Sequence, residues 1–273
     1  MTGDDGGPEA GTPPSDDRAP VDHPTYLDAK RELDDRSLNR DVLAAFAAAL
    51  PSDPAILEVG AGTATMVERL AEWGVVEGGR WVAVDAHEGA LTAGRERIGD
   101  RVGGVDVAFR VADAFEYAAA TDERFDAVVG CAFFDVVDAA PAVDALAAAS
   151  PLAYAPITYD GETTLAPADP EDDAVLDAYH RHMREYRAGG PEGAASLADA
   201  AESVVAAGPS PWRIRPPYSP DERTVLAHLL DTIESAVGEV GYDATDWAER
   251  RRAAMADGDL SYAAANRDLL VRL

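Results

Sequence analysis

The chain has 273 residues, 47% of them apolar, and a formal net charge of −28 at pH 7 from 51 acidic and 23 basic residues. Its single cysteine, Cys131, excludes an internal disulfide and a thiolate zinc cluster, and its apolar runs are too short for a membrane span. The N-terminus has neither a basic start nor an apolar stretch, so we expect a cytoplasmic protein.

The acidic residues are spread along the chain, and Lys30 is the only lysine. Such a surface would repel itself in dilute buffer, whereas molar salt shortens the Debye length to about 3 Å. The composition therefore favours a protein from a salt-accumulating halophile over a metal-binding acidic protein, whose acids would be clustered. The charge also gives some argument against nucleic-acid partners.

The N-terminal part contains two kinds of segment. Residues 1–20 are rich in Gly, Pro and Asp, which predicts a disordered acidic tail. Residues 21–50 have a helical pattern, which predicts a helical cap segment with one apolar face formed by Leu38, Val42, Phe46 and Leu50. Pro51 and Pro54 end this helical stretch.

Residues 51–158 alternate short apolar runs with amphipathic stretches, which predicts a parallel sheet covered by helices on both faces. The expected strands are 55–59, 81–84, 105–111, 127–131 and 152–157. The expected helices are 63–73, with Thr63 able to cap it, 88–98 and 143–149. The fold class is therefore α/β, a doubly wound Rossmann-like sheet.

The alternation of strands and helices is lost in residues 159–273, which we interpret as a helical insertion followed by completion of the same domain. The pattern predicts helices over 174–187 and 194–207 with no strand between them, then a sixth strand over 212–215. Further helices are expected over 222–237 and 246–255. Leu260, Tyr262 and Ala264 alternate at the start of a closing strand over 260–270.

The strongest local signal is a glycine turn between the first strand and its helix. Gly60 and Gly62 let the backbone approach a ligand closely, and the helix that follows offers free N–H groups. A dinucleotide site would need a third glycine at the sixth position, where Thr65 stands. The spacing therefore disfavours a dinucleotide.

Two acidic residues end the next two strands. Asp85 ends the second strand, where a carboxylate can accept hydrogen bonds from the hydroxyls of an adenosine ribose. The same residue can also serve as a helix N-cap. Asp113 follows the third strand, in a position to accept a hydrogen bond from an adenine amine. Both lie at the sheet edge where doubly wound folds bind ligands.

With these features the sequence resembles the class I S-adenosylmethionine-dependent methyltransferases. Their first motif, an acidic residue, an apolar residue and Gly-x-Gly, matches residues 58–62. The resemblance implies a seven-stranded, mostly parallel sheet whose last strand is antiparallel, with S-adenosylmethionine as cofactor. The cofactor-binding residues it implies are Glu58, Gly60, Ala61, Gly62, Asp85, Ala86, Asp113, Ala114 and Cys131.

The segment that follows the fourth strand departs from part of this family. Residues 131–134 read Cys-Ala-Phe-Phe where members that methylate amides and bases have Asn-Pro-Pro-aromatic, which argues against those substrates. Cys131 lacks the preceding proline of the enzymes that use a cysteine nucleophile, so we expect it to be a small residue beside the cofactor.

The residue that deprotonates the acceptor is less defined, and we select Lys30, Asp135 and Tyr159 as catalytic candidates. Other polar residues expected near the sheet edge are Tyr26, Asp34, Arg36, Asn39 and Asp160. Tyr26, Lys30 and Asp34 have fourfold spacing and share a helix face, which also fits a solvated face with an intrahelical ion pair. His228 and Glu234 either face the cavity under the insertion or form a buried pair.

No metal is expected, because His180 and His182 point to different faces of a helix and no third ligand is evident. The leading hypothesis is a methyltransferase acting on a small molecule. The alternatives are an NAD(P)-dependent oxidoreductase and a noncatalytic protein that binds S-adenosylmethionine.

Overall fold

Nine strands form one mixed sheet in the part of the chain that the computed structural model describes, residues 22–273. They are β1 (Ala55–Val59), β2 (Arg80–Asp85), β3 (Arg101–Val102), β4 (Val105–Val111), β5 (Ala127–Val129), β6 (Leu152–Ala166), β7 (Ser203–Pro209), β8 (Trp212–Ile214) and β9 (Ser261–Arg272). The order is β3-β4-β2-β1-β5-β6-β9-β7, with β8 paired to β9. The predicted tail, residues 1–20, lies outside the described residues.

The centre of the sheet confirms the predicted doubly wound architecture. Strands β4, β2, β1, β5 and β6 are parallel neighbours, and β9 is antiparallel to β6. Two antiparallel strands that were not predicted raise the predicted seven strands to nine. One is β3, which forms a hairpin with β4 through Gly103 and Gly104, both with positive φ; the other is β7, which pairs with β9.

Eleven helices occupy residues 22–273, and they divide among three hydrophobic clusters. They are α1 (His23–Ala29), α2 (Arg31–Ser37), α3 (Arg40–Ala49), α4 (Thr65–Glu72), α5 (Glu88–Ile98), α6 (Ala114–Ala120), α7 (Ala139–Ala147), α8 (Asp172–Tyr186), α9 (Gly193–Ala200), α10 (Pro220–Glu239) and α11 (Thr245–Asp257). Helices α3, α4 and α5 contribute to one cluster against the sheet, and α6, α7 and α9 to the other. The two clusters cover opposite sides of the strands, as alternating side chains of β1 require.

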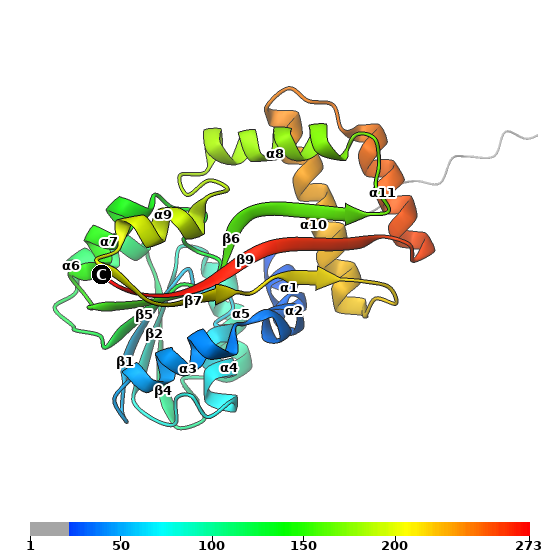
Figure 1. Cartoon of the computed structure of the whole chain (residues 1–273). Coiled ribbons are helices and arrows are strands. Elements are labelled where there is room, and N and C mark those ends of the chain that lie inside the picture. The colour runs from blue at the N-terminus through cyan, green and yellow to red at the C-terminus, as the bar shows by residue number, and fades with distance from the viewer. Residues whose placement is uncertain (1–21) are drawn as a thin grey trace, which may run out of the picture.

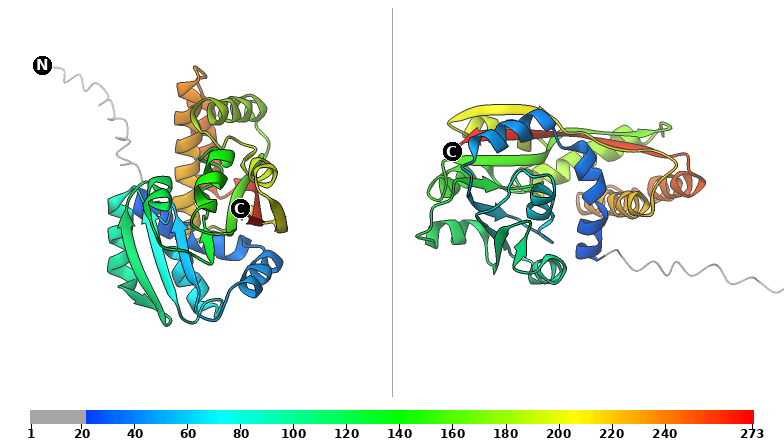
Figure 2. Two further views of the ribbon diagram at one scale, coloured as in Figure 1. Left: turned by 90° about the vertical axis from the view of Figure 1, so that its left-hand side faces the viewer. Right: turned by 90° about the horizontal axis from the view of Figure 1, so that it is seen from below.

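The third cluster is a cap built on the long ends of β6 and β9. These strands pair along nearly their whole length, from Leu152 opposite Arg272 to Ala166 opposite Ser261. Figure 1 shows them running side by side out of the sheet to α8, α10 and α11, and both views in Figure 2 show α10 and α11 together beyond the sheet. Residues of α1, α2, α8, α10 and α11 share the apolar core of this cap.

Several predicted boundaries are wrong. The helical run before the core is three helices, because Leu38 and Asn39 are extended and the Asn39 side chain caps α3. Thr63 does not cap the next helix: α4 begins at Thr65 after Ala64 in a left-handed conformation, and the Thr63 hydroxyl donates to Asp28 instead.

The structure also corrects the strands beyond the core. The predicted helix over 194–207 ends at Ala200, because Ser203–Pro209 pairs with β9 as strand β7. The predicted sixth strand is present as β8, but β7 takes the place next to β9 in the main order of the sheet. The fifth strand does not stop at Ile157; it continues as β6 to Ala166 through irregularities between residues 155 and 163. The fourth, β5, ends at Val129.

Within residues 22–273, no helix is long and apolar enough to cross a membrane.

Candidate functional site

A cavity of about 520 Å³ lies where the carboxyl ends of the parallel strands meet the cap. Gly60, Asp85 and Cys131, which follow or end β1, β2 and β5, form part of its wall. The remainder comes from α1, from the extended parts of β6 and β9, and from α8 and α10. The carboxyl-terminal edge of the sheet and the cap therefore border one common cavity.

The glycine turn has the backbone geometry that its sequence predicts. Gly60 has φ +60° and Gly62 φ +55°, values that residues with a side chain rarely adopt. A Cβ atom at Gly60 would lie 2.6 Å from Phe133 Cδ2, and one at Gly62 would lie 2.8 Å from Leu27 Cδ1. Two flexible side chains thus rest on the turn, and only glycine leaves room for close approach.

Asp85 holds this turn to the second strand. Its Oδ2 accepts a hydrogen bond of 2.8 Å from the Gly62 N–H, and its Oδ1 accepts one of 2.7 Å from the His87 N–H. The alternative role as N-cap is not observed, because His87 is the N-cap of α5 and its Nδ1 accepts from Ala90. Asp85 lines the cavity with its carboxylate anchored at the strand end.

The other residues that the family motif indicated do not line the cavity. Glu58 is buried among apolar side chains, where its carboxylate accepts a hydrogen bond of 2.7 Å from Trp81 Nε1, and burial raises its pKa to about 8. Asp113 is exposed and caps α6 by accepting from two backbone N–H groups. Ala61 and Ala114 are buried, and Ala86 is exposed beside Asp85.

Lys30 lies in the cavity wall as part of a buried charge cluster. Its Nζ is 2.9 Å from Asp34 Oδ2, and Asp34 Oδ1 accepts a hydrogen bond of 3.0 Å from Trp212 Nε1. Burial disfavours the charged ammonium, but the Asp34 carboxylate outweighs burial and holds the pKa of Lys30 above its ordinary value. The predicted ion pair exists, but it joins the junction between α1 and α2 to α2 and is buried rather than solvated, and Lys30 is a fixed cation rather than a base.

Tyr159 is also bonded within the protein. Its hydroxyl lies 2.9 Å from Thr163 Oγ1 and 2.9 Å from His180 Nε2. Burial raises the pKa of Tyr159 well above its ordinary range, so the side chain is a neutral phenol at physiological pH. It can donate to a ligand or relay a proton, but it is a poor base by itself.

Asp135 differs from the other two catalytic candidates because part of its carboxylate is free. Its Oδ1 is buried and has no hydrogen-bond partner in the described structure. Burial raises the pKa of Asp135, against the opposing influence of Arg187 and Lys30. A carboxylate with a raised pKa and an open oxygen has the properties of a proton acceptor.

Cys131 lines the cavity as a neutral thiol, because burial raises its pKa to about 12. A thiol nucleophile requires a lowered pKa, which argues against a nucleophilic role for Cys131.

Much of the cavity wall comes from the cap and was not predicted from the sequence. The missed residues include Thr163, Tyr179, Met183, Arg187, Trp212, Thr232, Tyr262 and Asn266. One signal for Asn266 was present, since it continues the inward alternation of Tyr262 and Ala264 and is a polar residue in an apolar series.

The remaining polar candidates fall into two groups. Tyr26 and His228 both line the cavity and stack with ring centroids 4.0 Å apart. The others have partners elsewhere: Arg36 with Glu222, Asp160 with Arg267, Glu234 with Arg252, and Asn39 at the start of α3. No cluster of three or more potential metal ligands occurs in residues 22–273.

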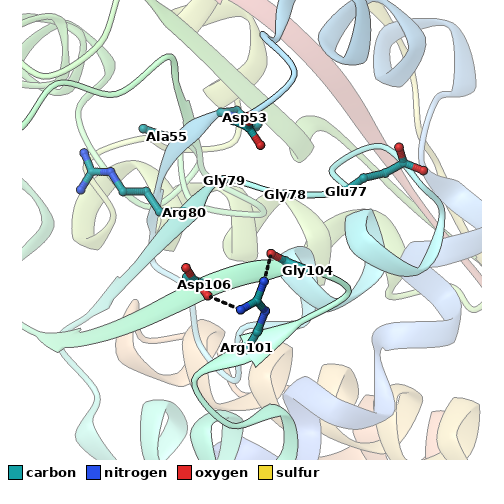
Figure 3. Close-up of a pocket in the computed structure, with 10 residues that line it drawn as sticks. Asp53, Ala55, Glu77, Gly78, Gly79, Arg80, Arg101, Gly104 and Asp106 are labelled. Atoms are coloured by element: carbon teal, nitrogen blue, oxygen red, sulfur yellow. Dashed lines mark hydrogen bonds and ion pairs between the residues drawn. The ribbon is translucent and has the colours of Figure 1, made fainter.

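A second hollow lies at the opposite, amino-terminal edge of the strands. Figure 3 shows its wall, which includes Asp53, Gly79 and Arg80, with Arg101 paired to Asp106 and to the Gly104 carbonyl. None of the predicted site residues lies there, and ligands of doubly wound folds bind at the carboxyl ends. The cavity under the cap is therefore the candidate active site.

The sheet order and the glycine turn define the class I methyltransferase fold, and comparison with known proteins agrees. Residues 56–152 match a family model described as a methyltransferase domain. No curated protein matches the chain by sequence.

Similar solved structures share the fold at low sequence identity. A SAM-dependent methyltransferase from Thiobacillus denitrificans, solved with S-adenosyl-L-homocysteine, is 16% identical over 93% of this chain and 100% of that one, with a TM-score of 0.50. A cyclopropane synthase from Mycobacterium tuberculosis is 12% identical over 89% of this chain and 83% of that one, with a TM-score of 0.46. Residues 56–152 therefore form a methyltransferase domain, and the chain shares the fold of the Thiobacillus denitrificans structure.

Proposed function

We propose that the chain transfers the methyl group of S-adenosylmethionine to a small-molecule acceptor. The observation that carries the proposal is the cavity itself, which joins the glycine turn and Asp85 to a wall of cap residues in one space of about 520 Å³. This volume lies within the range of sites for small ligands. Because it must admit the reactive end of the donor as well, it favours a small acceptor over a polymer.

The residues at the glycine turn fit the donor. Gly60 and Gly62 leave space that a Cβ atom would fill, once the ends of Phe133 and Leu27 rotate away. The Asp85 carboxylate stands at the end of β2, where it can accept from ribose hydroxyls. The donor supplies an electrophilic methyl group on a sulfonium, and the task of the protein is to align the acceptor and exclude water.

Asp135 supports a catalytic role over a purely binding one, because its free oxygen can accept the proton that an acceptor loses on methylation. The methyltransferase family match and Thr65, at the position where a dinucleotide site needs glycine, favour this function over a nicotinamide-dependent oxidoreductase.

The proposal is tested by calorimetric titration with S-adenosylmethionine, S-adenosylhomocysteine and NADH. We choose molar KCl, where the Debye length is about 3 Å, because we also propose that a chain of net charge −28 is adapted to high salt. Binding of the first two ligands and not of NADH is expected. NADH binding alone would refute the proposal, and turnover of any acceptor would exclude a noncatalytic role.

The substitution Asp85→Ala should weaken S-adenosylmethionine binding by about 100-fold, since it removes charge-assisted hydrogen bonds worth about 3 kcal/mol in total. Asp122→Ala, at an exposed position without a hydrogen-bond partner among the described residues, is the matched control and should bind normally. Equal affinity in the two variants would show that Asp85 does not hold the donor.

A further inference from the structure

Four charged side chains line the cavity, and two of them have no partner in the protein. Lys30 is paired with Asp34, and Asp85 accepts from two backbone N–H groups. In contrast, Asp135 Oδ1 is without a hydrogen bond, and the Arg187 guanidinium has neither an ion pair nor a side-chain hydrogen bond among residues 22–273. Asp135 Oδ1 is buried and Arg187 is half-buried, and a charge that is partly removed from water without a partner is costly, so these two groups are suited to a charged ligand.

A third polar group of the wall is also unpaired. Asn266 is 6% exposed, and its Nδ2 donor has no acceptor in the described structure. It lies on β9, on the same side of the strand as Tyr262 and Ala264, which also line the cavity. The wall therefore offers one unused carboxylate oxygen, one unused cation and one unused amide donor.

Packing places the two opposite charges near each other without joining them. The backbone of Gly189 lies against that of Asp135, since a Cβ atom at Gly189 would be 2.5 Å from the Asp135 carbonyl carbon. Arg187, two residues before Gly189, is close enough to influence Asp135 electrostatically, yet the two form no ion pair. Both side chains line the same cavity, which can take a molecule that carries both charges.

Aromatic side chains also form part of the cavity wall. The side chains of Tyr26, Tyr159, Tyr179, Trp212 and Tyr262 all line the cavity. The electron-rich faces of such rings attract ammonium groups, including methylated ones.

We propose that the acceptor is an amino acid, whose carboxylate binds Arg187 and the Asn266 amide and whose amine lies beside Asp135. This inference rests on the proposed function and names the substrate class of the same site. Asp135 Oδ1 takes a proton from the amine, and the freed nitrogen lone pair forms the new N–C bond. The C–S bond of the donor breaks at the same time, and its electron pair stays on sulfur.

The test measures S-adenosylhomocysteine formation by the full chain in molar KCl. Each of the twenty protein amino acids is supplied as acceptor, together with its decarboxylated amine and the corresponding hydroxy acid. Turnover is expected with one or more amino acids and not with their amine or hydroxy-acid analogues. Equal turnover of either analogue, or no turnover of any amino acid by a protein that binds S-adenosylmethionine, would overturn the inference. Absence of S-adenosylmethionine binding would refute the proposed function itself.

Variants separate the two ends of the acceptor. Arg187→Met should raise the KM for the amino acid by about 100-fold, with a smaller effect on kcat, because it removes a charged contact; Arg187→Lys should restore part of the loss. Asp135→Asn should lower kcat by at least about 100-fold, because it removes the proton acceptor. Arg124→Met and Asp144→Asn, both at exposed positions outside the cavity, are the controls. An unchanged KM in Arg187→Met would contradict the assigned carboxylate contact.

Discussion

The buried carboxyl group of Glu58 makes the stability of the protein depend on pH in a predictable direction. Burial raises its pKa from an ordinary value of 4.5 to about 8, despite the hydrogen bond from Trp81 and the charge of Arg69. Between these pH values the folded state holds a proton that the unfolded state has released. The free energy of unfolding therefore falls as pH rises, by about 1.4 kcal/mol per pH unit and roughly 4 to 5 kcal/mol in total.

The substitution Glu58→Gln removes this titration and keeps an oxygen that can accept from Trp81 Nε1. Its free energy of unfolding, relative to that of the unaltered protein, should increase steadily from about pH 5 to pH 8 and become constant above. Urea unfolding in molar KCl at several pH values measures the difference. The slope against pH is the informative quantity, because any fixed cost of the new amide cancels.

Glu96→Gln, at an exposed position on α5 with no hydrogen-bond partner among the described residues, serves as control and should show no such slope. A stability difference between Glu58→Gln and the unaltered protein that stays constant from pH 5 to 9 would refute the reasoning. It would mean that the carboxyl group titrates equally in the folded and unfolded states.

Two further predictions concern the glycine turn and the buried charge cluster. Gly62→Ala should destabilise the fold by about 1 to 2 kcal/mol, because the φ of residue 62 is left-handed. It should also abolish S-adenosylmethionine binding, because the new Cβ would fill the space that the donor needs at the turn. Gly238→Ala, on α10 with no atom within 4 Å of the added Cβ, should bind normally in the same titration. Asp34→Asn should cost about 3 to 5 kcal/mol by leaving the buried Lys30 ammonium without its carboxylate, seen as a fall in Tm of about 10 °C. Glu32→Gln, exposed on the same helix, should leave Tm nearly unchanged, and an equal fall in both variants would argue against the buried cluster.

The sequence by itself determined the features that depend on near neighbours in the chain. The strand, the glycine turn and the helix at residues 55–72 were predictable because turn geometry and hydrophobic periodicity are local properties. Asp85 was predictable for the same reason, since it directly ends an apolar strand. The antiparallel closing strand followed from the family resemblance, and the structure confirms it as β9.

Pairing between distant segments overrode local patterns elsewhere. The sequence pattern of residues 203–207 predicted the end of a helix. In the structure these residues form hydrogen bonds with the free edge of β9 and belong to β7. Glu58 fits the family motif for a cofactor contact, but in the structure its carboxylate accepts a hydrogen bond from Trp81 of the adjacent strand.

The acceptor side of the cavity is decided only by the tertiary structure. Asp135, Arg187 and Asn266 come from a loop after β5, the end of α8 and the strand β9, and no sequence spacing relates them. The long β6–β9 pair carries the cap over the sheet edge and thereby forms the wall to which they belong. The role that we propose for them depends on which polar groups remain unpaired after folding, and this cannot be known until all the other donors and acceptors have been paired in the folded structure.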